Sequence, residues 1–196
     1  MTLATLLSHV GIAVPRYVTV DGQIVLDAAP TTGFVSAPMP VAPHRFHDGE
    51  DPAPERSAYA SAWWNIDTDA RAADETAMAT HFPNFVQYAD DGDYAFGGEL
   101  NTGRGRFKIL VLPHVDKSLP TVIPLHKGLG RQAGRRLQRP PHLYTNGNLC
   151  IADSADWLPA EHTTATAVAW AAHWFAAYTE WRISSRWPTE GFGAAA

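Results

Sequence analysis

The stretch from Pro140 to Ala160 reads PPHLYTNGNLCIADSADWLPA and carries the most specific signals in the sequence. It holds the only cysteine of the 196-residue chain, Cys150, inside an apolar Leu-Cys-Ile triplet. The pair Asn146-Gly147 predicts a tight turn shortly before it, because both residue types tolerate the backbone angles that turns require. Taken alone, a cysteine between two large apolar residues is typical of a buried and inert thiol. Whether this thiol has a function must therefore be argued from the residues around it.

Three short runs upstream of this stretch have the composition of β-strands. They span residues 93–100, 106–112 and 121–125, and short segments separate them. Such short connections predict an antiparallel meander. Pro124 cannot donate a backbone hydrogen bond, which places the third run at a sheet edge or at a strand end.

Two helices are expected on either side of the meander. Residues 69–82 form the first, with Asp67 or Asp69 as its N-cap. Residues 163–184 form the second, which is long and carries bulky aromatic residues at helical spacing, namely Trp170, Trp174, Tyr178 and Trp181. Its charge-free part is shorter than the roughly 20 residues that a bilayer requires, so the sequence predicts a buried amphipathic helix and no membrane span.

The first 66 residues are expected to form an extension packed on the main domain, residues 67–196. Residues 2–10 are predicted to form a short helix. Residues 16–26 place an Asp-Gly pair between two β-rich runs, which predicts a hairpin. Frequent prolines and glycines in residues 28–54 predict an irregular connection. The elements together indicate an α+β fold.

Charge and cysteine content exclude several classes of protein. The chain has 15 Lys and Arg against 20 Asp and Glu, a net charge of −5, so no nucleic-acid partner is expected. A single cysteine excludes an intrachain disulfide and a thiolate-rich zinc site. The nine histidines show no metal-binding spacing, and no glycine-rich phosphate loop occurs, so neither a metal site nor a nucleotide site is expected. The N-terminus does not read as a signal peptide, which favours a cytoplasmic location.

Two segments of the quoted stretch match a known pattern. Residues 146–151 read Asn-Gly-Asn-Leu-Cys-Ile, and residues 157–160 read Trp-Leu-Pro-Ala. In this order and spacing they resemble the active-site region of ubiquitin-conjugating enzymes, over about residues 68–187. The resemblance is strongest to the divergent bacterial members that occur with activating enzymes and ubiquitin-like modifiers, some of them in antiviral defence. It implies a ubiquitin-conjugating-enzyme-like sandwich, an antiparallel meander flanked by helices, with an N-terminal extension.

The resemblance also implies a reaction. Cys150 would accept the modifier from an activating enzyme as a thioester and pass it to an amine of a protein substrate, which suits sulfur as both nucleophile and leaving group. No cofactor is implied for this chain, because ATP is consumed upstream. The supporting active-site loop is expected to contain Asn146, Gly147, Asn148, Trp157 and Pro159. The Asn-Gly turn should bring the thiol to the surface.

One position departs from the family pattern. The asparagine usual eight residues before the cysteine is His142 here. Its N–H can replace the family's oxyanion donor, or the residue can instead order the loop through backbone contacts, with Asn146 and Asn148 as reserve donors. Asp153 and Asp156 either orient an incoming lysine or are solvated loop charges.

A basic segment lies between the third strand and the cysteine. Four of its residues recur at every fourth position, so a helix would align them, whereas glycines at 128, 130 and 134 favour a solvated loop. In an acidic protein such a patch attracts an acidic partner. The candidate docking residues are Lys127, Arg131, Arg135, Arg136 and Arg139.

Two other functions remain open from the sequence. A thiol hydrolase could pair Cys150 with His142 or another histidine as base, and would cleave an amide or thioester instead of preserving it. A non-catalytic variant of the same fold could bind a modifier without transferring it.

Overall fold

The structure is a computed structural model that describes residues 16–26, 37–47, 61–89, 92–126 and 128–192. The predicted helix at residues 2–10 lies outside these ranges, as does Lys127. Most of the predicted irregular segment from residue 28 to residue 54 lies outside them as well.

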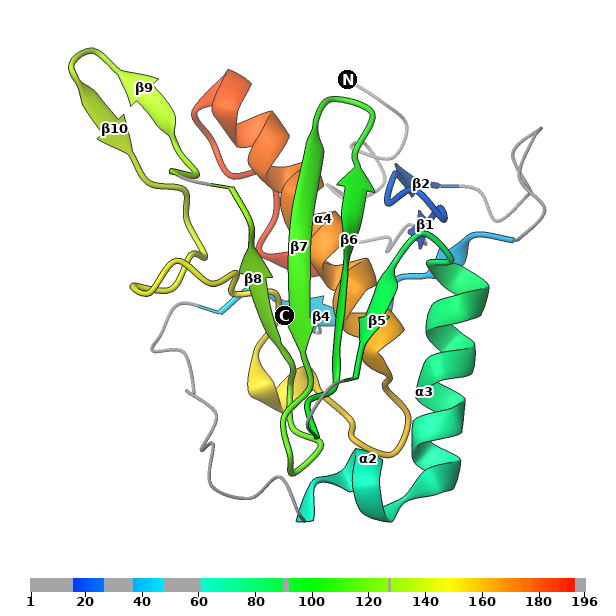
Figure 1. Ribbon diagram of the computed structural model, residues 1–196. Helices are drawn as coiled ribbons and strands as arrows, with labels where there is room; N and C mark the ends of the chain where they lie inside the picture. Colours follow the sequence, from blue (N-terminus) through cyan, green and yellow to red (C-terminus); the bar gives the residue numbers. More distant parts are fainter. Residues whose placement is uncertain (1–15, 27–36, 48–60, 90–91, 127, 193–196) are drawn as a thin grey trace.

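A four-stranded antiparallel sheet forms one layer of the molecule (Figure 1). Its order is β5 (Val86–Tyr88), β6 (Ala95–Asn101), β7 (Arg106–Leu112) and β8 (Thr121–Pro124). The predicted three-stranded meander is confirmed as β6, β7 and β8. Strand β8 is an edge strand that ends at Pro124, also as predicted. Strand β5 was not predicted, because a run of only three residues is too short to give a strand signal in the sequence.

The two predicted helices are present. Helix α3 (Thr68–His81) follows the short helix α2 (Trp63–Ile66), and the Asp67 carboxylate caps it by accepting a hydrogen bond from the backbone of Ala70. Helix α4 (Thr164–Ser184) begins with a capping box between Thr163 and Thr166. The mixed composition of helices and antiparallel strands confirms the predicted α+β class.

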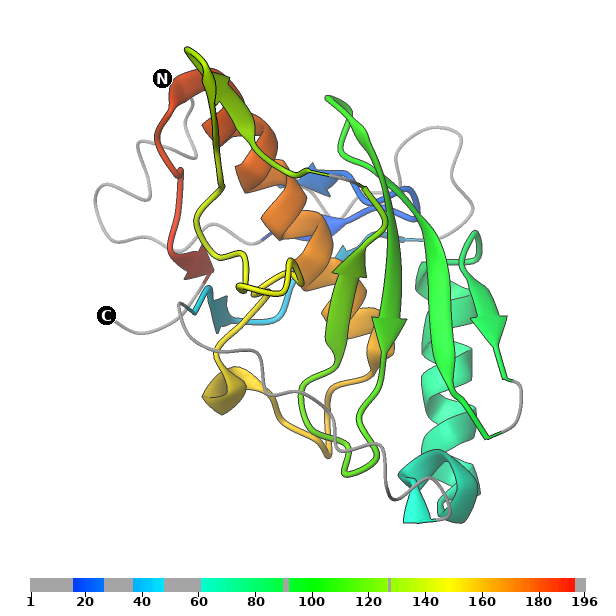
Figure 2. The same ribbon diagram turned by 60° about the vertical axis from the view of Figure 1, so that its left-hand side comes forward.

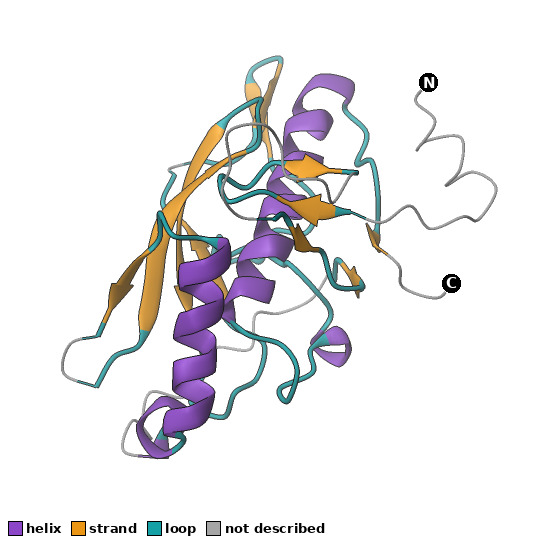
Figure 3. Cartoon of the chain, turned by 90° about the vertical axis from the view of Figure 1, so that its right-hand side faces the viewer, coloured by secondary structure: helices purple, strands orange, loops and turns teal. Residues whose placement is uncertain are grey.

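Helix α4 differs from the prediction because it is not amphipathic. Sixteen of its 21 residues are buried, on all sides of the helix. The sheet covers one side, where Phe175 stacks on Phe107 of β7 with ring centroids 4.2 Å apart. On the opposite side Trp170 Nε1 donates to the backbone carbonyl of Ala42, 3.0 Å away. Figure 3 shows α4 between the large sheet and the small N-terminal strands. In the described part of the chain, no helix has both the length and the apolar character needed to cross a membrane.

The N-terminal segments supply this second cover. Strands β1 (Tyr17–Val18) and β2 (Ile24–Val25) form the predicted hairpin, and β3 (Met39–Pro40) pairs with the other edge of β1. Strand β4 (His44–Arg45) instead pairs antiparallel with β11 (Gly191–Phe192) near the end of the chain. One apolar core therefore includes side chains from residues before and after position 67.

The basic segment forms neither a helix nor an open loop. Strands β9 (Arg131–Ala133) and β10 (Arg136–Gln138) make an antiparallel hairpin, which places Gly134 at the turn with a positive φ of 63°. The four-residue spacing of the basic residues is therefore not a helical repeat. Gly130 fixes the base of the hairpin by donating its N–H to the Tyr178 hydroxyl of α4, 3.0 Å away. Figure 1 shows the hairpin projecting beside the C-terminal end of α4.

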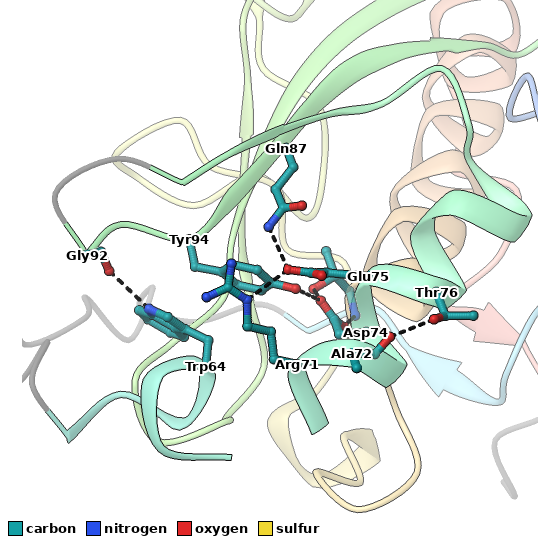
Figure 4. A network of polar contacts seen from close by, with 10 residues as sticks. Trp64, Arg71, Ala72, Asp74, Glu75, Thr76, Gln87, Gly92 and Tyr94 are labelled. Atoms are coloured by element: carbon teal, nitrogen blue, oxygen red, sulfur yellow. Dashed lines mark hydrogen bonds and ion pairs between the residues drawn. The ribbon is translucent and has the colours of Figure 1, made fainter. Parts of the chain in front are cut away.

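A buried carboxylate joins the two long helices to the sheet (Figure 4). Asp74 of α3 accepts hydrogen bonds from the Tyr94 hydroxyl just before β6 and from the backbone N–H and hydroxyl of Thr164 at the start of α4. Burial raises the pKa of this carboxyl group above its usual range. Since all three donors would lose their partner without it, Asp74 fixes where α4 begins relative to α3.

Candidate active site

The predicted Asn-Gly turn is present before the cysteine. Gly147 has a positive φ of 94°, and its N–H donates to the carbonyl of Tyr144, 2.8 Å away. The Asn146 side chain accepts a hydrogen bond from the backbone of Asn148, 3.0 Å away. Leu149 then donates its N–H to the carbonyl of Val122 in β8. The turn therefore docks the following residues on the edge of the sheet.

Cys150 is buried, which contradicts the prediction that the turn brings it to the surface. Its exposed fraction is 1%, and its neighbours Leu149 and Ile151 are equally well covered. The prediction failed because the turn feeds a short β-bridge to Val122 instead of an exposed loop. In addition, a segment from the distant N-terminal part of the chain lies over the thiol.

The immediate cover of the thiol is polar. Cys150 Sγ donates to the backbone carbonyl oxygen of His47, the residue that ends the described segment after β4. His142 Nδ1 lies 3.4 Å from the same oxygen and can donate to it. A sulfhydryl and an imidazole N–H thus converge on one carbonyl oxygen. This arrangement differs from the apolar surroundings of an inert thiol.

His142 is itself held from several sides. It adopts a left-handed backbone conformation with φ of 53° and is buried. Its carbonyl accepts hydrogen bonds from Trp174 Nε1 of α4 at 2.8 Å and from the backbone of Cys150 at 3.1 Å. Its ring packs against Trp187 with centroids 5.2 Å apart, and its Nε2 lies 3.4 Å from the Glu190 carboxylate. The backbone contacts order the loop. The ring faces the His47 carbonyl oxygen that the Cys150 sulfur also contacts.

The two aspartates after the cysteine contact β4. Asp156 accepts a hydrogen bond from the backbone N–H of Arg45 at 2.6 Å and lies 3.7 Å from its guanidinium. Asp153 donates its own N–H to the Arg45 carbonyl at 2.7 Å, and its carboxylate lies 3.7 Å from His47 Nδ1. Neither side chain is simply a solvated charge, because the Asp156 carboxylate accepts the Arg45 N–H and the Asp153 carboxylate accepts the Ala155 N–H. Figure 2 shows this segment, β4, beside β11.

The Trp-Leu-Pro-Ala segment after the cysteine contains one buried residue and one exposed residue that were expected at the site. Trp157 is buried, and its indole N–H donates to the carbonyl of Lys117, 2.9 Å away. Pro159 is exposed in the loop that leads into α4. Trp157 therefore ties the chain after the cysteine to the loop between β7 and β8.

A buried histidine pair anchors β4 to α4. Arg16 Nη1 donates to His173 Nε2 at 2.5 Å, so the proton of His173 must sit on Nδ1, which donates to His44 Nε2 at 3.0 Å. His44 Nδ1 then donates to the Ala42 carbonyl at 2.9 Å. Burial lowers the pKa of His44 to about 4 and holds the pKa of His173 well below its usual range. Both rings are neutral near neutral pH and fully hydrogen-bonded.

Comparison with known families identifies the chain. A protein-family model described as Type II CBASS E2 protein matches residues 74–194, which is more than half of the chain. The chain belongs to the Type II CBASS E2 family. This is a bacterial E2-like family of antiviral defence, and CBASS E2 proteins work with E1-like activating enzymes and ubiquitin-like modifiers. Comparisons with curated proteins and with solved structures gave no match.

The CBASS E2 match spans both His142 and Cys150. Two other residues at the site, His47 and Glu190, could not be predicted from the sequence. His47 lies outside the matched range and Glu190 near its end, and neither stands in a recognisable motif. His47 is 103 residues from the sulfur that its carbonyl contacts. The pairing of β4 with β11, together with the contacts of β4 to Asp153, Asp156 and α4, brings them to the thiol. Within the described ranges, no group of three or more His, Cys, Asp or Glu side chains could hold a metal ion.

Acidification should destabilise the fold through the buried histidine pair. Because the folded-state pKa of His44 lies below that of the unfolded chain, the unfolded chain takes up the proton first as pH falls from about 6.5 towards 4. The free energy of unfolding should fall by about 2 kcal/mol from this group alone between about pH 7 and about pH 5. Urea unfolding at both pH values measures this loss, which His44→Gln should reduce. His126→Gln, at an exposed position, should follow the wild type; an equal loss in His44→Gln would contradict the assignment.

Proposed function

We propose that the protein accepts a ubiquitin-like modifier from an activating enzyme as a thioester on Cys150 and passes it to an amine of a protein substrate. Membership of the CBASS E2 family supports a ubiquitin-like conjugation function in bacterial defence. The chain has one cysteine, and it stands at the position that the conjugating-enzyme pattern requires. Residues 67–196 form the catalytic part in this proposal, and residues 1–66 an extension of it.

One observation carries the chemical part of the proposal. The carbonyl oxygen of His47 is approached by both Cys150 Sγ and His142 Nδ1. A modifier joined to the sulfur would place its own thioester carbonyl beside the same imidazole. His142 therefore stands where a donor to the oxyanion is needed.

The reaction has two steps. In loading, the Cys150 thiolate attacks the carbonyl carbon of the incoming thioester; a new carbon–sulfur bond forms, the old one breaks, and the activating enzyme's thiolate leaves. In discharge, an amine nitrogen attacks the new thioester, and the resulting oxyanion accepts a hydrogen bond from His142. Collapse forms the amide, expels the Cys150 thiolate and releases the amine proton. Asn146, Gly147, Asn148, Trp157 and Pro159 support this loop.

The basic hairpin is the proposed docking element. Arg135 and Arg136 lie at its exposed end, and Arg139 is exposed below them. Residues 128–139 contain no acidic residue, although the whole chain carries a net charge of −5. Such a local field favours an acidic partner surface, here that of the activating enzyme, and accelerates its encounter. Lys127 and Arg131 belong to the same segment, but Arg131 also packs over the Trp181 ring at its base.

A reconstituted reaction tests the function. Incubation with the activating enzyme, ATP and modifier should give an adduct on the wild-type protein that persists for minutes and is released by a reducing thiol. Cys150→Ala should give none. His142→Leu should load normally but discharge to lysine about 10²- to 10³-fold more slowly, because the oxyanion donor is lost.

His142→Asn is the matched control, because its amide N–H restores a donor. It should discharge much faster than His142→Leu. Unchanged discharge in His142→Leu would remove the donor role from His142. Cleavage of the modifier substrate without any adduct would instead identify a thiol hydrolase.

Neutralising the hairpin should slow loading. The double variant Arg135→Gln with Arg136→Gln should lower the initial loading rate about tenfold at low salt, and added salt should reduce this difference. Arg104→Gln with Arg106→Gln removes the same charge from the β6–β7 turn and the first residue of β7, and should load like the wild type. Equal rates for the two double variants would exclude the hairpin as the docking element.

A further inference from the structure

The geometry points to an autoinhibitory strap. We infer that the segment His44–His47, here called the strap, covers Cys150 in the resting protein and must leave it before the thiol can take up a modifier. This inference rests on the proposed function, since it concerns the regulation of the same thiol. The strap lies outside residues 74–194, the range that the family match covers.

The strap occupies the space that the reacting group needs. Cys150 exposes 1% of its surface, and its sulfur contacts the His47 carbonyl oxygen directly. His142 Nδ1 faces the same oxygen at 3.4 Å. An incoming thioester must bring its carbonyl carbon to the sulfur and its carbonyl oxygen towards the imidazole. It cannot do so while the His47 carbonyl holds both positions.

One edge of the strap is a short β-pairing. Arg45 of β4 pairs with Gly191 of β11, and the Phe46 N–H donates to the carbonyl of Glu190 at 2.8 Å. The paired strands are only two residues long. So short a ladder contributes little independent stability.

The other edge is held by the loop that follows the cysteine. Asp153 donates its N–H to the Arg45 carbonyl, and the Asp156 carboxylate accepts the N–H of Arg45. The Arg45 side chain is 52% exposed, so its ion pair with Asp156 is screened by solvent. Contacts of this kind open locally at a lower cost than global unfolding.

The two ends of the strap differ in how firmly they are fixed. His44 is wholly buried against His173 of α4, whereas the His47 side chain is 47% exposed. The strap can therefore swing away at its His47 end while its root stays on α4. The same movement would end the contacts of Asp153 and Asp156 with the strap, so that their carboxylates could orient an acceptor lysine. Opening thus exposes the nucleophile and frees two acids together.

Alkylation of the single cysteine measures this opening in the intact chain. With excess iodoacetamide, Cys150 Sγ forms a bond to the reagent's methylene carbon and iodide leaves, and intact-mass spectrometry follows the product. Asp156→Ala removes an acceptor of the strap and should raise the alkylation rate about tenfold. Arg45→Ala keeps the backbone contacts and should raise it about threefold.

Asp67→Ala is the matched control. Its carboxylate also accepts a backbone N–H, that of Ala70, but at the start of α3. It should stay within about twofold of the wild-type rate, since the strap is untouched. Wild-type rates in both Asp156→Ala and Arg45→Ala would overturn the inference. If Asp156→Ala proves unfolded by circular dichroism, Arg45→Ala decides by itself.

The alkylation assay contains neither activating enzyme nor modifier, so it separates this inference from the proposed function. Faster alkylation in the strap variants without any modifier adduct would support the strap and exclude the carrier role. A normal adduct together with unchanged alkylation in the strap variants would support the carrier role and overturn the strap.

Discussion

Helix α4 has to hide apolar residues on all of its sides, and the arrangement of the molecule follows from that constraint. Sixteen of its 21 residues are buried, and a single sheet can cover only one side of a helix. The N-terminal strands must therefore pack against the other side. Because these strands pack there, β4 passes close to Cys150, which approaches the site from the side of the large sheet.

Two indole N–H groups of α4 position the His142 loop and the segment before β4. Trp174 Nε1 donates to the carbonyl of His142, and Trp170 Nε1 donates to the carbonyl of Ala42 at the root of β4. These residues are four positions apart, one turn of helix, so they point the same way. Helix α4 thus positions both the loop that holds Cys150 and the segment that covers it. The burial of the thiol therefore results from the packing of both segments on α4 and not from the Leu-Cys-Ile triplet alone.

Local signals predicted most of the fold. The Asp-Gly turn predicted the β1–β2 hairpin, the cap at Asp67 predicted α3, the spacing of the aromatic residues predicted α4, and three β-rich runs predicted the meander. These signals act within a few residues. Strand β5 was not predicted because its three residues are fewer than a strand signal needs. The basic hairpin was missed because its four-residue spacing resembles a helical repeat, and only Gly134 at the turn reveals its true geometry.

The site was predicted only in part. The sequence indicated Cys150, His142 and the turn between them, because these residues are close together in the chain. It could not indicate His47 or Glu190, since the contacts that bring them to the site join residues about 100 and 50 positions apart. It also predicted the wrong exposure for the thiol, because burial depends on such distant contacts. Long-range packing, and not the local motif, determines how far the Cys150 thiol is exposed.

If Cys150 carries the acyl group as proposed, the strap covers its thiol in the free protein and leaves it on loading. Hydrogen–deuterium exchange at the amides of Phe46 and Asp153, compared between the free protein and the modifier-loaded protein, tests it most directly. Both amides bond across the edges of the strap, to Glu190 and to Arg45 respectively. Both amides are expected to exchange faster once the sulfur is acylated. Equal or slower exchange in the loaded protein would contradict it.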